Sequence, residues 1–228
     1  MTPPRPLIIE LAGPAGAGKS TLARLLAARN PALARSDGVW GQPRRALLAG
    51  AWRSVATWAR LWWQARSPLW RETAQLVRLE ALRHHFTANG ITRQSATATV
   101  VDEGPVFALA WLLATGHPVF RTRSVDAWWR NAVSRWAGMV DVVVLLDAPD
   151  DELAERINGR AKPHVLRGAD AATVTAFAAR FRAAFNRVLV ELPWQRAPLV
   201  LRYDTTVDPP DTIAAHLDPI IDQRVHAN

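Results

Sequence analysis

No cysteine occurs among the 228 residues, which excludes disulfide bonds, a thiolate zinc site and a thiol nucleophile. Lysine is nearly absent too, since only Lys19 and Lys162 are lysine among the 28 basic residues. No stretch approaches the roughly 18–20 uninterrupted apolar residues of a membrane span, and the first residues show no signal-peptide pattern. These absences predict a cytoplasmic protein, with membrane association left open.

Acidic residues are outnumbered by basic ones, 20 against 28, and the formal net charge is +8. Such a surplus is typical of proteins that bind nucleic acid, an anionic membrane surface or anionic substrates, although a GC-rich genome also favours arginine. Apolar residues make up 49% of the chain, which is ample for a core. The length fits one α/β domain, so we expect a single domain over residues 1–228.

A glycine-rich segment joins the apolar run at residues 7–12 to a helical pattern at residues 22–28. Its spacing, G-x-x-x-x-G-K-[ST], is that of the Walker A phosphate loop. In such a loop the glycines let successive N–H groups point at phosphate oxygens, the lysine contacts the β- and γ-phosphates, and the hydroxyl ligates Mg²⁺. The sequence therefore predicts a site for ATP and Mg²⁺ that consists of Gly13, Pro14, Ala15, Gly16, Ala17, Gly18, Lys19, Ser20 and Thr21.

Strand and helix patterns alternate along the chain, which is typical of a parallel sheet with helices on both faces. We expect strands at residues 6–12, 95–101, 140–146 and 198–203, with a further short strand near 38–40. We expect helices at residues 18–29, 44–66, 69–88, 105–115, 123–137, 149–158, 170–191 and 209–224. Ligands of such sheets bind at the carboxyl ends of the strands, where Asp102, Glu103, Asp147 and Asp204 fall.

These features resemble a P-loop kinase of the nucleoside and nucleotide kinase group, most closely thymidylate kinase. The similar segments are the phosphate loop at 13–21, the acidic strand exit at 102–103, and the strand–Asp–x–Pro–helix run at 142–157. The resemblance implies a three-layer α/β/α fold with a five-stranded parallel sheet and a small basic lid at about 159–169. It also implies an ATP- and Mg²⁺-dependent phosphotransferase that moves the γ-phosphoryl group to a small-molecule acceptor.

The resemblance assigns roles by position. The implied catalytic residues are Lys19, Asp102, Glu103, Arg156 and Arg160, with Lys162 and Arg167 as further lid cations. Ser20 and Asp102 are the implied metal ligands. Asp102 and Glu103 are both candidates for the base that takes the acceptor's proton.

The acidic strand exit departs from the pattern of these kinases. Thymidylate kinases usually carry Asp-Arg-aromatic there and deoxynucleoside kinases Glu-Arg-Ser, whereas this chain has Asp102-Glu103-Gly104-Pro105. A second carboxylate near the usual position of a cation favours a neutral, hydroxyl-bearing acceptor over thymidylate. The alternative is a nucleotide-binding ATPase or switch that acts through a protein partner, with action at a membrane surface left open. Only the net charge suggests nucleic acid, so no specific nucleic-acid partner is expected.

Two of the strand-end acids also have plain structural interpretations. Asp147 fits a helix N-cap better than a catalytic acid. Asp204 fits a loop cap as well as it fits a residue that positions the nucleotide base.

Tryptophan is concentrated in the segment at 44–88, the expected acceptor region. Apolar side chains recur there in steps of four and three and define one helical face, which consists of Leu48, Trp52, Val55, Ala59 and Trp62. Three interpretations remain open: core packing that also walls the acceptor pocket, a membrane-surface helix, and a homodimer interface.

Overall fold

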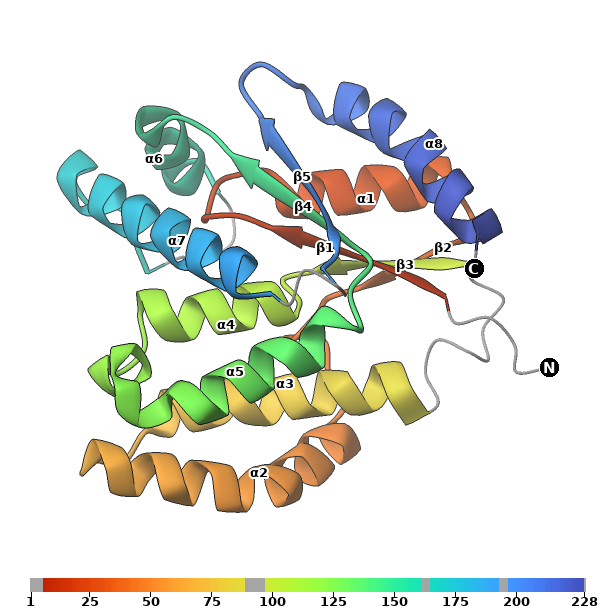
Figure 1. Cartoon of the computed structure of the whole chain (residues 1–228). Coiled ribbons are helices and arrows are strands. Elements are labelled where there is room, and N and C mark those ends of the chain that lie inside the picture. The colour runs from red at the N-terminus through yellow and green to blue at the C-terminus, as the bar shows by residue number, and fades with distance from the viewer. Residues whose placement is uncertain (1–5, 89–96, 161–164, 193–196, 228) are drawn as a thin grey trace.

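The computed structural model describes residues 6–88, 97–160, 165–192 and 197–227. The strands of this part are β1 (Leu7–Ala12), β2 (Leu33–Ser36), β3 (Ala98–Asp102), β4 (Val142–Asp147) and β5 (Leu199–Asp204). They form a five-stranded parallel sheet in the order β2-β3-β1-β4-β5 (Figure 1). The three central strands are apolar and almost wholly buried, as expected of parallel strands covered on both faces.

Helices cover both faces of the sheet. α1 (Lys19–Arg29) and α8 (Pro210–Ala227) lie on one face, and α4 (Pro105–Ala114) and α7 (Ala171–Glu191) lie on the other (Figure 1). The remaining helices are α2 (Arg44–Ala65), α3 (Trp70–Ala88), α5 (Asp126–Ala137) and α6 (Asp150–Asn158), with short 3-10 turns at Pro118–Arg121 and Arg123–Val125. The predicted three-layer α/β/α architecture with a five-stranded parallel sheet is confirmed.

The sheet separates two large apolar cores. On one face Val143 of β4 belongs to a cluster with Leu109 of α4 and Phe181 of α7. On the other face Val144 belongs to a cluster with Leu26 of α1 and Leu217 of α8. Burial of both clusters holds the carboxyl ends of the strands at a fixed edge, which is where the phosphate loop lies.

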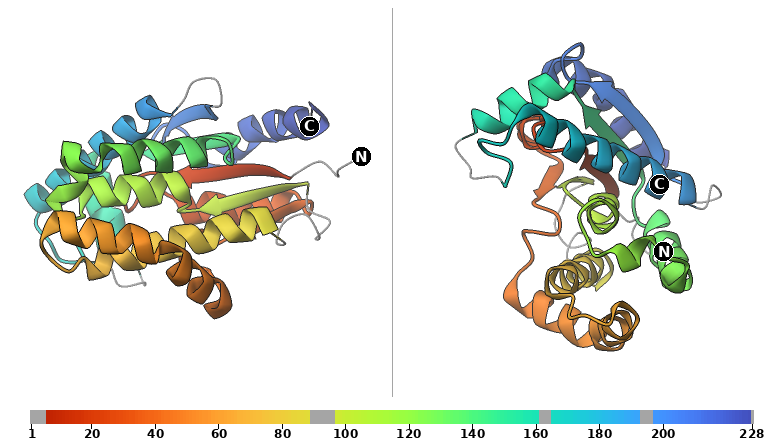
Figure 2. Two further views of the ribbon diagram at one scale, coloured as in Figure 1. Left: turned by 60° about the horizontal axis from the view of Figure 1, so that its bottom comes forward. Right: turned by 90° about the vertical axis from the view of Figure 1, so that its left-hand side faces the viewer.

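α2 and α3 pack against each other beyond α4 and α5, so that α2 is the outermost helix on that side of the molecule (Figure 2). The side of α2 that faces inward carries mostly small residues, and its buried members are Ala46, Gly50, Ser54 and Leu61. The large apolar side chains Leu48, Trp52 and Val55 instead face solvent. The core-packing interpretation of the stripe at 48–62 is therefore wrong for most of its members.

The remaining sequence predictions differ from the structure in smaller ways. The prediction of a strand near residues 38–40 is wrong. β2 lies earlier in the chain, and residues 38–40 form a turn whose Val39 N–H donates a hydrogen bond to the carbonyl oxygen of Glu103. The predicted turn at 89–90 lies outside the described residues. No helix in the described ranges has both the length and the apolar content needed to cross a bilayer.

Candidate functional site

The phosphate loop connects β1, the central strand, to the first turn of α1. Gly13 has a φ of 144°, and a Cβ atom added there would lie 2.1 Å from the carbonyl oxygen of Leu146 on β4. Gly18 has a φ of 86° and precedes α1, whose first turn has no side-chain cap. Glycine is needed at both positions, and the uncapped first turn of α1 has the geometry that helix N-termini use to bind anions.

Lys19 folds back over this loop. Its Nζ donates hydrogen bonds to the carbonyl oxygens of Gly13 at 2.9 Å and Pro14 at 3.0 Å. The same nitrogen lies 3.5 Å from Oε1 of Glu103. The side chain is buried, so its charge is shielded from bulk water and acts on whatever occupies the loop.

Ser20 and Asp102 meet where β1 pairs with β3. Leu11 is in register with Asp102, which brings this carboxylate beside the start of the phosphate loop. Ser20 Oγ donates a hydrogen bond to Asp102 Oδ2 at 2.5 Å. Burial raises the pKa of Asp102 above its ordinary value. Its second oxygen, Oδ1, is buried and has no hydrogen-bond partner among the described residues.

The side-chain oxygens of Ser20 and Asp102 fit Mg²⁺. The cation prefers hard oxygen ligands, and it is usually held by one or two protein oxygens together with phosphate oxygens and water. The hydroxyl of Ser20 and the carboxylate of Asp102, including its unpartnered oxygen, supply such ligands. The described ranges contain no cluster of three or more histidine, aspartate or glutamate side chains that could hold a metal ion. A cation at Ser20 and Asp102 would therefore need further ligands such as phosphate oxygens or water.

Glu103 is held in an unusual backbone conformation. Its φ is 61°, in the left-handed region that non-glycine residues seldom adopt. The loop after β2 fixes it there, because Val39 N donates to the Glu103 carbonyl at 3.1 Å and Trp40 Nε1 donates to Glu103 Oε2 at 2.6 Å. This arrangement turns the carboxylate toward Lys19, and strain of this kind is often found at functional sites.

A third carboxylate, Glu10, lies buried beneath the acidic pair. Its two oxygens accept hydrogen bonds from the backbone N–H groups of Val106 at 2.9 Å and Phe107 at 2.8 Å. Burial raises the pKa of Glu10 to about 8, against the opposing effect of these hydrogen bonds. A Cβ atom on Gly104 would lie 2.8 Å from Glu10 Cδ, so a larger residue there would displace the Glu10 carboxyl. The sequence signal was a single acid inside the apolar run at 7–12.

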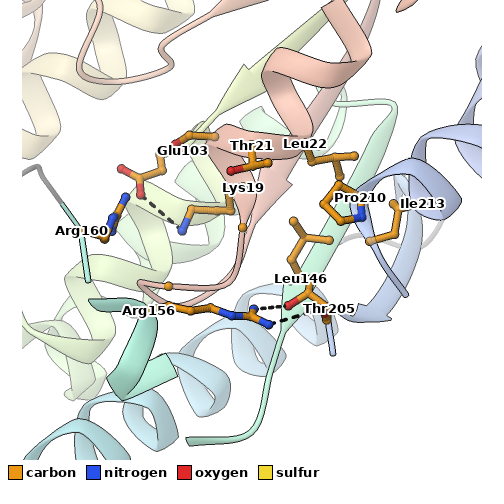
Figure 3. A pocket seen from close by; sticks show the side chains of 13 residues that line it. Lys19, Thr21, Leu22, Glu103, Leu146, Arg156, Arg160, Thr205, Pro210 and Ile213 are labelled. Carbon is orange, nitrogen blue, oxygen red and sulfur yellow. Dashed lines mark hydrogen bonds and ion pairs between the residues drawn. The ribbon is translucent and has the colours of Figure 1, made fainter. Parts of the chain in front are cut away.

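The phosphate loop opens into a cavity of about 330 Å³. Figure 3 shows Lys19, Glu103 and Arg160 along one side of it and Arg156 with Thr205 along another. Arg156 Nη1 donates to Thr205 Oγ1 at 2.7 Å. Apolar side chains complete the lining near Thr205, and they are Leu146, Pro210 and Ile213. The cavity thus has a charged end at the loop and a more apolar end between β4, β5 and α8.

The predicted lid is only partly described. Arg160 lines the cavity on the side of Glu103, whereas Arg156 is directed toward β5 (Figure 3). Arg167 is exposed, and Leu166 in the same segment is buried. Lys162 lies outside the described residues, so its predicted role stays a prediction.

The interpretation of Asp147 as a helix N-cap is wrong, because Pro149 occupies that position and α6 has no side-chain cap. Asp147 instead accepts two hydrogen bonds from Arg182 of α7, at 2.6 and 3.0 Å. Arg182 also donates to Asp150 Oδ1 at 2.6 Å. The pKa of Arg182 is raised, mainly by its hydrogen bonds to Asp147. No pattern in the sequence indicates the role of Arg182, since its partners are more than 30 positions away.

Asp204 caps the loop that follows β5. Its Oδ1 accepts hydrogen bonds from the backbone N–H of Thr206 at 2.9 Å and from the Thr206 hydroxyl at 2.6 Å. The loop-cap interpretation of Asp204 is confirmed.

Comparison with known proteins agrees with this geometry. A family model described as AAA domain matches residues 9–173. Among similar solved structures is the YorR protein from Bacillus subtilis in complex with phosphorylated GDP, with 13% identity and a TM-score of 0.52 over 96% of this chain and 98% of that chain. No curated protein sequence matches the chain.

Two kinases are similar to the same extent. Thymidylate kinase from Candida albicans is 14% identical, with a TM-score of 0.56 over 96% of this chain and 92% of that one. Deoxyadenosine kinase from M. mycoides, solved with the products dCMP and dCDP, is 13% identical, with a TM-score of 0.53 over 95% and 99% of the two chains. At these identities the likeness establishes the fold, and the predicted resemblance to P-loop nucleoside and nucleotide kinases is confirmed at that level.

Proposed function

Because this chain belongs to the AAA domain family, we propose that it is an ATP- and Mg²⁺-dependent kinase that transfers the γ-phosphoryl group of ATP to a small-molecule acceptor. One observation carries the proposal: a lysine, a hydroxyl and two carboxylates converge at the phosphate loop. Lys19 Nζ lies 3.5 Å from Glu103, and Ser20 Oγ lies 2.5 Å from Asp102. A phosphate loop beside two acids serves phosphoryl transfer through positioning and charge neutralisation.

The nucleotide fits the cavity in one direction. Its phosphates would bind the loop at Lys19, and its base would lie toward Thr205, where the lining is more apolar. Arg156 is directed at that end through its hydrogen bond to Thr205. We therefore assign Arg156 to the base and ribose rather than to the transferring phosphoryl group.

The transferring group would lie between Lys19 and Arg160. Both side chains line the charged end of the cavity, and their positive charges would neutralise the equatorial oxygens of the γ-phosphoryl group. Ser20 and Asp102 would hold Mg²⁺, which supplies further charge neutralisation at the β- and γ-phosphates. Closure of the segment at 159–169 would exclude water, so that the acceptor rather than water receives the phosphoryl group.

Glu103 is our candidate for the catalytic base. Its side chain lines the cavity, whereas Asp102 is bonded to Ser20 and is not part of the lining. The acceptor hydroxyl would give its proton to the Glu103 carboxylate as its oxygen bonds to the γ-phosphorus, and the bond to the bridging oxygen would break to release ADP. Trp40 Nε1, 2.6 Å from Oε2, would keep the carboxylate in place for this step.

The charge of Glu103 also bears on the acceptor. This carboxylate stands where the similar kinases usually carry arginine, and it would repel the phosphate of a nucleoside monophosphate. A neutral acceptor with a reactive hydroxyl meets no such repulsion. We therefore propose a neutral, hydroxyl-bearing acceptor rather than thymidylate.

The test is transfer of γ-labelled phosphate from Mg²⁺-ATP to a panel of neutral alcohols, nucleosides and nucleoside monophosphates. We expect labelled product from a neutral member of the panel and none with Lys19→Ala. Transfer to thymidylate with higher kcat/KM than to every neutral compound would overturn the acceptor assignment. Hydrolysis of ATP that no acceptor stimulates, together with nucleotide-dependent binding of a protein, would support the alternative of an ATPase or switch.

A further inference from the structure

We propose that the outer face of α2 is a docking surface for a membrane that contains anionic lipids. This face is built from residues that do not line the cavity of the proposed kinase site.

Large apolar side chains form a stripe on this face. Leu48, Trp52 and Trp63 are 73%, 83% and 85% exposed, and Val55 between them is exposed too. Their spacing of four, three and eight residues places them on one side of a helix. We call Leu48, Trp52, Val55 and Trp63 the outer stripe.

Packing within the molecule does not account for the outer stripe. Around Gly50, α2 contacts α3 through small residues, and a Cβ atom on Gly50 would lie 2.5 Å from the Val77 carbonyl oxygen. Trp62, which is not part of the outer stripe, donates a hydrogen bond to Thr73 of α3. Ser54, also buried, donates its hydroxyl to the Gly50 carbonyl at 2.7 Å. An ordinary surface helix turns its large apolar residues toward the core, whereas α2 leaves Leu48, Trp52 and Trp63 in solvent. Exposed apolar groups on this scale mark an interaction site.

The charge around the outer stripe identifies the partner. Residues 38–71 contain no aspartate or glutamate and six arginines, namely Arg44, Arg45, Arg53, Arg60, Arg66 and Arg71. Arg53 and Arg60 are both exposed and lie along one edge of the stripe. Tryptophan and leucine bordered by arginine are typical of a helix that lies in the interface of an anionic bilayer, where each cation near the surface adds to the attraction.

The same charges argue against a second copy of this chain. A symmetric dimer through α2 would bring the arginines of one subunit against those of the other, and no acid in residues 38–71 is present to neutralise them. A bilayer meets no such repulsion. Since α2 is the outermost helix on its side of the molecule, its stripe can reach a flat surface (Figures 1 and 2). Trp70, exposed and packed edge-on against Trp62, extends the aromatic surface.

Sedimentation with vesicles tests the proposal. We expect the protein to bind phosphatidylcholine vesicles that contain phosphatidylglycerol and to bind pure phosphatidylcholine weakly. Trp52→Ser/Trp63→Ser should lower the partition coefficient about tenfold or more, because two large apolar side chains are lost. Arg53→Gln should lower it about fivefold, as expected for one surface cation.

Matched controls change the same residue types elsewhere. Val190→Ser removes an exposed apolar side chain from α7, and Arg180→Gln removes an exposed charge from the same helix, so neither should change binding. Lys19→Ala should bind vesicles like the parent protein, which separates this test from that of the kinase proposal. Absence of binding to anionic vesicles, or equal binding by Trp52→Ser/Trp63→Ser, would overturn the proposal. So would a lipid-free dimer, measured by analytical ultracentrifugation, that this double variant abolishes.

Discussion

Asp102 and Glu103 are adjacent in the sequence, but their side chains have different partners. The carboxylate of Asp102 accepts from Ser20, whereas that of Glu103 meets Lys19 and Trp40. The left-handed backbone at Glu103, with a φ of 61°, produces this division. One acid can therefore serve the metal while the other serves the acceptor.

Asp102→Asn tests the first of these roles. We expect kcat to fall by about 10²-fold or more, because a neutral amide binds Mg²⁺ more weakly than a carboxylate does. Affinity for ATP without Mg²⁺ should change little, since Lys19 and the loop amides remain. Steady-state kinetics and calorimetric titration measure the two quantities. A variant with near-parental turnover would contradict the metal role.

The raised pKa of buried Glu10 predicts that the stability of the protein depends on pH. Its carboxyl has a pKa of about 8 in the folded protein and near 4.5 when exposed, so the folded chain binds the extra proton between these values. The free energy of unfolding should therefore fall as the pH rises from about 5 to 8, by up to about 1.4 kcal/mol per unit. Glu10→Gln cannot ionise, so urea titrations should show a flatter dependence on pH. An unchanged slope in the variant would contradict the protonated state of Glu10.

At the scale of elements, α7 holds α6 and the end of β4 in place. Arg182 bonds Asp147 at the end of β4 and Asp150 in the first turn of α6. α6 in turn carries Arg156, and Arg160 follows its end. The position of both cavity arginines therefore depends on a helix that does not line the cavity itself.

Arg182→Lys tests this dependence. Lysine cannot form the forked hydrogen bonds to Asp147, so the free energy of unfolding should fall by about 1–3 kcal/mol. KM for ATP should rise as well, because Arg156 loses its support. Arg180→Lys, an exposed change on the same helix, is the control for urea unfolding. Equal denaturation midpoints for the two variants would show that the network contributes little.

At the scale of the whole molecule, the site and the outer stripe lie on different layers. The phosphate loop sits at the end of the central strand, whereas α2 is packed beyond α4 and α5. They are linked through the turn at 37–43, which starts after β2, contacts Glu103 and leads into α2. None of the stripe residues lines the cavity, so we expect that each can be altered without unfolding the other.

Ligand-induced stabilisation tests this separation. ATP at about 100 times its dissociation constant should add about 2.7 kcal/mol to the free energy of unfolding and raise Tm by roughly 5–10 °C. Lys19→Ala should lose this rise, and Trp52→Ser/Trp63→Ser should keep it. Differential scanning fluorimetry measures both. A double variant that no longer responds to ATP would show that the outer stripe supports the site.

The sequence by itself determined the phosphate loop, the alternation of strands and helices, and the acids at the strand ends. Those features depend on local spacing and on apolar runs, both of which are visible in residues that are close together in the sequence. The tertiary structure alone decided that α2 faces outward with its large residues, that Asp147 bonds Arg182, and that Glu10 is buried beneath Gly104. Each of these depends on which distant segment packs against the residue. Periodicity along one helix or strand shows which residues share a face, but it does not show which segment contacts that face.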